Sequence, residues 1–340
     1  MEIAVALSGG IDSAFTAHLL KEEGHRVWGI TMVHHEGAWD TLERVKRVAR
    51  TLGIPLEVAD MREPFRQEVL TPFVRAYSQG LTPNPCPLCN RRVKLGILMN
   101  KALSLGAERM ATGHYAQVAA GEEGPRLLKG VDTRKDQSYF LALLSREQLA
   151  RLILPLGQKT RKEVEEKARE LGLWEEGLKS SQEICFLQGH YTRLLERLGI
   201  DPGPGPLVDM EDRVLGTHKG YTHYTIGQRR GLGVATGEPL YVVRVIPQEN
   251  KVVVGPAQAL MAKRIRLAWV HWIHLPPGDP PWELKVRIRY RHQEAPALVM
   301  ASGREITFLA SQRAPTPGQL AVFYRDQEVM GGGEIIEVFN

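Results

Sequence analysis

The first 200 residues alternate between short apolar runs and segments of helical period. The apolar runs are Ile3 to Leu7, Val27 to Met32, Leu56 to Ala59 and Arg109 to Ala111, and the helical segments include Thr41 to Leu52, Pro64 to Tyr77 and Asn90 to Leu105. This alternation is typical of βαβ units and predicts a parallel sheet. Because ligands bind beyond the carboxyl ends of such strands, we expect the loops after Leu7, Met32 and Ala111 to surround one crevice.

The pattern changes near residue 200. Residues 136–172 and 190–199 are predicted to be helical, and the Pro-Gly repeat from Asp201 to Pro206 interrupts every period, as a linker does. Short β-like runs follow, separated by Gly and Pro turns, at 221–226, 240–246, 251–254, 265–274, 284–291, 297–301, 305–310, 320–324 and 334–339. This spacing predicts one or two small barrels.

Length and composition fit a globular enzyme. The 340 residues exceed what one hydrophobic core normally serves, so we expect two or three domains, and 43% apolar with 24% charged residues is ordinary. No basic region precedes an apolar stretch at the N-terminus, and no run of about 18 uncharged apolar residues occurs. We therefore expect a cytoplasmic protein without a membrane segment. The net charge of +5 permits a polyanionic partner without requiring one.

A glycine-rich turn, Ala6-Leu-Ser-Gly-Gly-Ile-Asp-Ser13, joins the first apolar run to a helical pattern. Its glycines let backbone N–H groups approach an anion, Ser8 and Ser13 add hydroxyl donors, and the helix dipole adds partial positive charge. The turn lacks the Gly-Lys-Ser/Thr ending of a Walker A loop, so it fits a pyrophosphate held without a lysine, with Asp12 able to hold Mg²⁺. An ordinary turn before a helix is the alternative.

This turn resembles the signature Ser-Gly-Gly-x-Asp-Ser of the PP-loop ATP pyrophosphatase superfamily. Its members split ATP into AMP and pyrophosphate and activate an oxygen by adenylation. The resemblance implies that ATP is a co-substrate and that Asp12 belongs to the catalytic residues. It assigns ATP binding to Ala6, Leu7, Ser8, Gly9, Gly10, Ile11, Asp12 and Ser13.

Three cysteines, an odd number, do not form a disulfide framework and indicate reactivity or metal binding in a reducing compartment. Cys86 and Cys89 lie in a Pro-rich loop before a predicted helix, whose dipole would stabilise the Cys89 thiolate and make it reactive. Cys185 lies far along the same predicted domain. Structural zinc is less favoured, because one Cys-x-x-Cys pair supplies only two of four ligands. Buried, inert cysteines are the remaining alternative.

Two later segments fit a nucleic-acid partner. In the predicted strand Lys285 to Arg291, period-2 geometry places Lys285, Arg287, Arg289 and Arg291 on one face. Such a row fits a phosphate backbone, and equally a solvated face that protects a sheet edge. Residues 217–233 interleave aromatics, cations and glycines as RNA-binding surfaces do, although aromatic β-core residues would look the same. We favour RNA as the partner.

An ordered set of motifs resembles the tRNA-specific 2-thiouridylase family essentially from end to end. The motifs are Ser8 to Ser13, Thr112 to Tyr115, Lys135 to Phe140, Leu154 to Gly157, Ser181 to Phe186, Tyr224 to Arg229 and Arg289 to Arg291. The resemblance implies an α/β fold: an N-terminal PP-loop domain of the adenine nucleotide alpha hydrolase type with a parallel sheet (residues 1–200), a small central tRNA-binding domain (201–258) and a C-terminal β-barrel (259–340).

The resemblance also implies a sulfurtransferase that thiolates C2 of the wobble uridine in certain tRNAs, with ATP and Mg²⁺. Adenylation turns the poor leaving group at C2 into a good one and releases pyrophosphate. In this account Cys185 carries a persulfide sulfur, supplied by a cysteine desulfurase or a sulfur-relay protein. Cys89 is the nucleophile that attacks the persulfide, releasing sulfide or closing a Cys89–Cys185 disulfide as 2-thiouridine forms.

Further positions match the family's contacts. Met32 and Gly113 match the ATP site. The uridine must leave the anticodon stack, and Asn84, Pro85 and Cys86 match the target-base segment. The other tRNA-contacting positions are His114, Lys135, Asp136, Gln137, Arg289, Tyr290 and Gln319.

This chain departs from the family pattern at Cys86, where many members carry aspartate. The family resemblance gives that aspartate a proton-shuttling or base-positioning role, which Cys86 could fill only if its pKa were strongly lowered. Alternatively, Cys86, Cys89 and Cys185 could hold a 4Fe–4S cluster with one open iron for sulfide. A second departure is the short connection after Met32, whose His34 and His35 we do not expect to be metal ligands.

Three other functions share some of these features. A PP-loop amidase or ligase would need neither the cysteine pair nor a basic barrel. A noncatalytic tRNA-binding protein would not need an intact ATP loop. A thiolase acting on cytidine or on another uridine would share both the loop and the cysteines.

Overall fold

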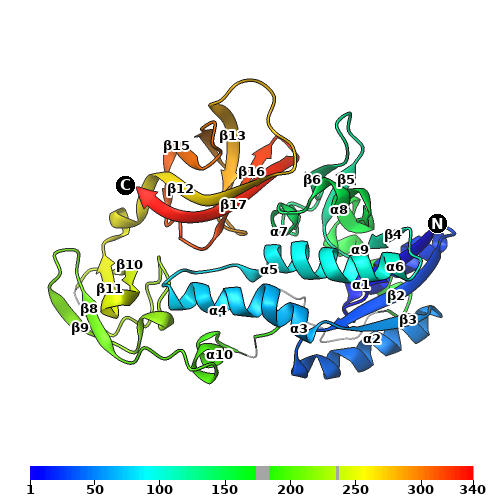
Figure 1. The fold of residues 1–340 in the computed structure, drawn as a ribbon, viewed down its shortest axis with the longest axis horizontal. Coiled ribbons are helices and arrows are strands. Elements are labelled where there is room, and N and C mark those ends of the chain that lie inside the picture. The colour runs from blue at the N-terminus through cyan, green and yellow to red at the C-terminus, as the bar shows by residue number, and fades with distance from the viewer. Residues whose placement is uncertain (174–183, 188, 235–236, 340) are drawn as a thin grey trace.

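The computed structural model describes residues 1–173, 184–187, 189–234 and 237–339. They form three sheets: one in the first part of the chain, one in the central part, and one that combines the C-terminal strands with a hairpin from the first part (Figure 1). The segment Ser181 to Glu183, which belongs to one of the family motifs, lies outside the described residues.

The N-terminal sheet is parallel, as predicted. Its order is β3 (Leu56–Asp60), β2 (Arg26–Val33), β1 (Glu2–Ala6), β4 (Arg109–Ala111) and β7 (Leu152–Ile153). Side chains alternate across β1, so Ile3 and Val5 pack on one layer of helices and Ala4 on the other. The first layer contains α1 (Ile11–Glu22) and α2 (Trp39–Leu52), and β1, β2 and β4 end together at the edge expected to hold the crevice.

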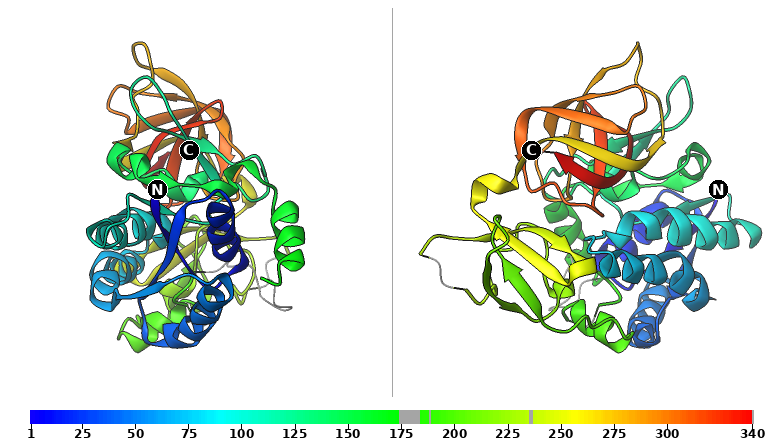
Figure 2. Two further views of the ribbon diagram at one scale, coloured as in Figure 1. Left: turned by 90° about the vertical axis from the view of Figure 1, so that its right-hand side faces the viewer. Right: turned by 60° about the vertical axis from the view of Figure 1, so that its left-hand side comes forward.

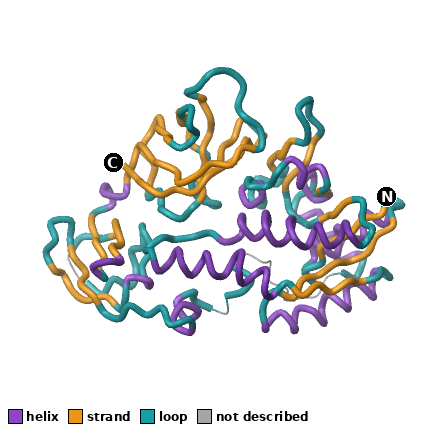
Figure 3. The backbone as a smooth tube through the Cα atoms, in the orientation of Figure 1, coloured by secondary structure: helices purple, strands orange, loops and turns teal. Residues whose placement is uncertain are grey.

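Two helical runs lie on the other side of the sheet (Figure 3). The first comprises α3 (Arg62–Phe65), a π-helix (Arg66–Leu70) and α4 (Thr71–Ser78), and the second comprises α5 (Pro85–Leu88), a π-helix (Cys89–Leu98) and α6 (Met99–Ser104). The predicted helix over 136–172 is broken into α7 (Ser138–Leu141), α8 (Arg146–Ala150) and α9 (Arg161–Glu170). Strand β7 and a 3₁₀ turn at Pro155–Gln158 separate α8 from α9.

The central part begins with α10 (Thr192–Arg197) and contains a sheet in the order β10 (Tyr241–Ile246), β11 (Lys251–Gly255), β8 (Gly205–Val208) and β9 (Val214–His218). The strand predicted at 221–226 is wrong, because Tyr221–His223 form a 3₁₀ turn. Gly220 and Gly227, at φ +133° and +88°, interrupt the extended run, and the turn brings the Tyr221 and Tyr224 rings into the same core.

The C-terminal part is a closed six-stranded barrel, which confirms the expected architecture. Its order is β12 (Met261–Trp272), β15 (Glu305–Arg313), β14 (Ala295–Val299), β13 (Trp282–Arg287), β16 (Leu320–Arg325) and β17 (Glu328–Phe339), and β12 pairs with β17 to close it. The closing strands approach so tightly that a Cβ at Gly331 or Gly333 would collide with the backbone of β12.

A hairpin that the sequence did not predict joins the first part of the chain to the barrel. Strands β5 (Ala116–Ala119) and β6 (Arg126–Lys129) extend the barrel sheet, because Leu128 of β6 pairs with Glu328 of β17. The views in Figure 2 show this hairpin beside the barrel. Tyr324 of the barrel belongs to the same buried cluster as Tyr139 and Leu127, so the two parts share a core. Among the described residues, no helix combines the length and apolar character needed to cross a membrane.

Candidate active site

The glycine-rich turn lies between β1 and α1, at the edge of the sheet that the chain pattern predicted. Gly10 precedes the helix without a side-chain cap, so the first N–H groups of α1 have no intrahelical or side-chain partner among the described residues. The Ser8 and Ser13 hydroxyls lie 3.2 Å apart, and the Ser13 hydroxyl donates to the Gly10 carbonyl at 2.9 Å. Gly9 has φ +75°, which a Cβ would strain. The turn therefore presents backbone donors to an anion, as a nucleotide phosphate requires.

The loop after β4 lies directly against this turn. A Cβ at Gly113 would come within 2.8–2.9 Å of the Asp12 backbone, so only glycine permits this approach. The Tyr115 hydroxyl donates to the Asp12 carboxylate at 2.8 Å, and the Arg161 guanidinium forms an ion pair with the same oxygen. Asp12 is therefore already engaged by α9 in this structure. One third of the Asp12 side chain remains exposed, which leaves its second carboxylate oxygen open to Mg²⁺. Mg²⁺ binding there remains a prediction.

The structure brings the three cysteines into one neighbourhood. Burial, with a smaller contribution from the nearby Cys185, raises the pKa of the Cys86 thiol to about 11 and that of Cys89 to about 12. The positive charge of Lys94 opposes the increase at both thiols. Cys185 is exposed as a residue, although its surroundings still desolvate the thiol and raise its pKa.

The expected dipole stabilisation of Cys89 is wrong for this conformation. Helix α5 begins at Pro85 with Asn84 as its N-cap, so Cys89 lies one turn after the helix start. It is 9% exposed, and desolvation disfavours its thiolate. Cys89 is therefore protonated near neutral pH in the free protein.

Sequence reasoning missed the partner of Cys185. The Cys185 sulfur lies 3.4 Å from Nε2 of His34, the residue that follows β2 at the same sheet edge. Nδ1 of His34 lies 3.5 Å from the Met32 carbonyl, which favours the tautomer with its proton on Nδ1. Burial, with a contribution from His35, lowers the pKa of His34 to about 4, so the ring is neutral. Nε2 of His34 can then accept a hydrogen bond from the Cys185 thiol.

Aromatic packing holds the Cys185 segment against the helices. The Phe186 ring lies edge-on to Phe65 at 5.4 Å and to Phe73 at 5.3 Å, and Tyr77 stacks on Tyr191 at 4.4 Å. Contacts of this kind stabilise the packing of residues 184–187 on the helices. They position Cys185 beside His34.

The three thiols do not fit a metal cluster as the structure places them. Within residues 1–173, 184–187, 189–234 and 237–339, no group of three or more His, Cys, Asp or Glu side chains converges on a point that could hold a metal ion. Cluster ligation requires thiolates, whereas burial favours the protonated form at Cys86 and Cys89. We therefore derive no step through iron.

Alkylation of the free protein tests this arrangement. We expect iodoacetamide to modify Cys185 first and Cys86 and Cys89 at least about tenfold more slowly at pH 8, because their raised pKa values leave little thiolate and their sulfurs are covered. All three rates should increase as the pH rises towards 9 and above. Peptide mass spectrometry over time measures the order, with urea-unfolded protein as the control. Equal rates in the folded protein would contradict the arrangement.

Several residues matched to tRNA contacts gather where the first part of the chain meets the barrel. Nε2 of Gln319 donates to the Thr82 carbonyl at 2.6 Å, just before the Asn84 to Cys86 segment. The Tyr290 ring lies 4.3 Å from that of Phe140. Oε1 of Gln137 accepts from the Tyr115 backbone at 2.9 Å, which joins this region to the ATP loop. Nδ1 of His114 forms a 2.7 Å hydrogen bond with the Thr112 hydroxyl. Burial lowers the pKa of the His114 ring.

The predicted row of four cations is not a free surface. Strand β13 ends at Arg287, whose guanidinium bonds to Asp136 and Glu294 in a largely buried network. Arg289 lies beyond the strand and donates to the Ala314 carbonyl at 2.8 Å and to the Thr316 hydroxyl. Lys285 is exposed as expected. The strand geometry behind the predicted row ends at Arg287, and two of the cations, Arg287 and Arg289, satisfy internal acceptors.

Asp136 is likewise buried. Its carboxylate accepts from the backbone N–H groups of Gly130 and Ser138 at 3.0 and 3.1 Å and from Arg287 at 3.2 Å. The side chain is 4% exposed, so in this structure it holds the loop between β6 and α7 together. Lys135, next to it, is half-buried, and direct RNA contact at either position stays a prediction.

The segment 217–233 divides between the two interpretations. Tyr221 and Tyr224 are buried in the central core, as the β-core alternative stated. Arg229 and Arg230 remain partly or fully exposed between glycines, so the basic part of the segment is accessible.

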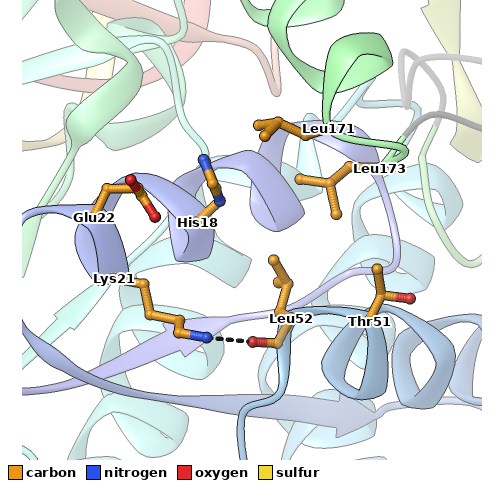
Figure 4. Close-up of a pocket in the computed structure, with 7 residues that line it drawn as sticks. All are labelled: His18, Lys21, Glu22, Thr51, Leu52, Leu171 and Leu173. Atoms are coloured by element: carbon orange, nitrogen blue, oxygen red, sulfur yellow. Dashed lines mark hydrogen bonds between the residues drawn. The ribbon is translucent and has the colours of Figure 1, made fainter.

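A shallow pocket elsewhere on the domain has no place in this site. It lies at the far end of α1 from the glycine-rich turn (Figure 4). Its lining consists of His18, Lys21, Glu22, Thr51, Leu52, Leu171 and Leu173. Nζ of Lys21 donates to the Leu52 carbonyl at 2.6 Å, so this lysine stabilises the end of α2.

Fold and site together define a class: an α/β nucleotide-binding domain of the PP-loop type, with thiols at the edge of the sheet that carries the phosphate-binding turn. Family models match successive parts of the chain. The tRNA methyl transferase HUP domain matches residues 1–189, the tRNA methyl transferase PRC-barrel domain 193–256 and the aminomethyltransferase β-barrel domain 262–335. The expected bounds at 200 and 258 remain predictions.

Relatives agree with this class over nearly the whole chain. The proteins named tRNA-specific 2-thiouridylase MnmA from Syntrophomonas wolfei and Desulforudis audaxviator are 43% and 45% identical to it, over 98% of this chain and 100% and 98% of their own lengths. The chain belongs to the tRNA-specific 2-thiouridylase family. Among solved structures, the U34-tRNA thiolase NcsA from Methanococcus maripaludis, with its 4Fe–4S cluster, matches 58% of this chain and 65% of its own at 17% identity and a TM-score of 0.38. That similarity is too remote to inform the sulfur chemistry.

Proposed function

We propose that this protein is a tRNA 2-thiouridylase, a sulfurtransferase that uses ATP to convert the wobble uridine of certain tRNAs to 2-thiouridine. One observation carries the proposal. The sulfur of Cys185, a residue exposed at the surface, lies 3.4 Å from His34, which follows β2, at the sheet edge where the phosphate-binding turn follows the neighbouring strand β1. Nucleotide activation and sulfur delivery can therefore meet at one place.

The reaction has two stages, activation of the uridine and delivery of sulfur, and different residues serve each stage. The N–H groups and hydroxyls from Ser8 to Ser13 hold the triphosphate while the C2 oxygen of uridine attacks the α-phosphorus and pyrophosphate leaves. Cys185 receives a sulfur atom from a persulfide donor, which leaves as a thiol. Neutral His34 orients the Cys185 thiol by accepting its hydrogen bond at Nε2, and the thiol proton leaves with the departing thiolate of the donor.

Sulfur transfer to the uridine then requires no external oxidant, because Cys89 supplies the electrons that release sulfide from the persulfide. The Cys89 thiol attacks the Cys185 sulfur of the persulfide, which forms a Cys89–Cys185 disulfide and releases sulfide. Sulfide attacks the activated C2 and displaces AMP, and a dithiol reductant restores both cysteines for the next cycle. Since Cys89 is buried and protonated in the free protein, this scheme requires that bound tRNA uncover it.

We propose cysteine persulfide rather than a cluster as the sulfur carrier, because within the described residues no three or more His, Cys, Asp or Glu side chains converge on a point that could hold a metal ion. The expected donor is a cysteine desulfurase or a sulfur-relay protein, and the expected compartment is the cytoplasm.

The function is tested by mass spectrometry of tRNA nucleosides. A strain that lacks this protein should lose 2-thiouridine and regain it with the wild-type gene. Purified protein should release pyrophosphate only when tRNA is added, which distinguishes it from a ligase with a small acceptor. Unchanged 2-thiouridine, or loss of a thiolated cytidine instead, would contradict the proposal.

A further inference from the structure

The phosphate-binding turn lacks a lysine of its own, yet an arginine from a neighbouring helix lies against it. Arg44 is on α2, and a Cβ at Gly9 would lie 2.9 Å from its Nε and 3.4 Å from its Cγ. The Arg44 side chain thus occupies the space beside the one glycine of the turn whose φ is positive.

Among the residues that the structure describes, the Arg44 guanidinium has no hydrogen-bond or ion-pair partner. Its Nε is buried without a hydrogen bond in the part of the chain that the structure describes, and no ion pair of Arg44 occurs among those residues. A buried donor without an acceptor is costly and calls for an explanation such as an ion or ligand. The other nearby arginine differs, because Arg161 is engaged by Asp12 and Glu165.

We propose that Arg44 binds the pyrophosphate portion of ATP and supplies the cation that the turn itself lacks. A guanidinium suits this role because its planar donors pair with two phosphate oxygens at once. The β- and γ-phosphates carry the negative charge that leaves as pyrophosphate, so Arg44 would stabilise both the bound nucleotide and the leaving group. This inference rests on the proposed use of ATP and adds a residue that the turn motif does not contain.

Binding to three probes tests the inference without any turnover. Calorimetric titration with ATP, pyrophosphate and AMP, each with Mg²⁺, should show that Arg44→Gln weakens ATP and pyrophosphate binding about tenfold or more. AMP, which lacks the β- and γ-phosphates, should bind within about twofold of the wild type, and Arg44→Lys should retain part of the ATP affinity. Arg50→Gln removes the same charge from the exposed face of α2 and should bind all three probes as the wild type does.

Two results would overturn the inference. One is an ATP affinity of Arg44→Gln equal to that of the wild type. The other is an AMP affinity that falls as much as the ATP affinity, which would indicate a distorted site. Thermal unfolding of Arg44→Lys and Arg50→Gln checks that the fold is intact. A wild-type protein that binds neither ATP nor pyrophosphate would instead refute the proposed function, and this inference with it.

Discussion

Replacement of Cys185 with serine is expected to abolish 2-thiouridine formation while tRNA-dependent pyrophosphate release continues. The serine oxygen has nearly the shape of the sulfur but cannot carry a persulfide, so only the second stage of the reaction is lost. Loss of a nucleophile of this kind lowers the rate by about 1,000-fold or more. Single-turnover assays with purified tRNA would follow pyrophosphate and thionucleoside in the same sample.

The pyrophosphate signal is the internal control, because it shows that the variant still binds ATP and tRNA. Thiolation by Cys185→Ser at the wild-type rate, with a physiological persulfide donor, would refute the role of Cys185. Anaerobically purified wild-type protein gives an independent result. Colourless, fully active protein without iron excludes a required cluster, whereas activity that depends on bound iron would overturn the persulfide proposal.

The second large effect concerns stability. Arg287→Met is expected to lower the free energy of unfolding by about 3–5 kcal/mol, because it leaves the carboxylates of Asp136 and Glu294 buried without their cation. The Arg287 side chain is 14% exposed and those of its partners are 4% and 13% exposed, so solvent cannot replace it. Lys129, 3.0 Å from Glu294, compensates only one of the two charges.

Urea unfolding followed by fluorescence would measure this loss. The matched control is Lys285→Met, an exposed residue of the same strand, which should change stability by no more than about 0.5 kcal/mol. Similar effects of the two substitutions would show that Arg287 is not part of a buried network. The same comparison decides whether this strand presents a row of free cations.

The sequence predicted the fold well where a local pattern decides it. Strands β1 to β4 follow from apolar runs bounded by turns, and the convergence of the loops after β1 and β4 follows from parallel topology. The β5–β6 hairpin was missed because its four-residue strands are stabilised by pairing with β17, about 200 residues away in the chain. The turn at Tyr221 was missed for a similar reason, since a tertiary core overrides the β propensity of its residues.

The candidate site divides in the same way. The phosphate-binding turn and the cysteines belong to recognisable sequence motifs and could be predicted. Other elements supply His34, Arg161 and Arg44, and no sequence motif marks these residues. The reactivity of Cys89 was misjudged because the Pro-rich loop defines a helix start but not how deeply that helix is buried. Burial depends on packing against the whole domain, and no local pattern reports it.

The burial of Cys89 has a consequence for the idle enzyme. In the proposed mechanism, a Cys89 thiol that stays protonated and covered does not discharge the sulfur carried by Cys185, and such a thiol does not react readily with peroxide. A loaded enzyme could thus wait for its RNA without leaking hydrogen sulfide into the cell.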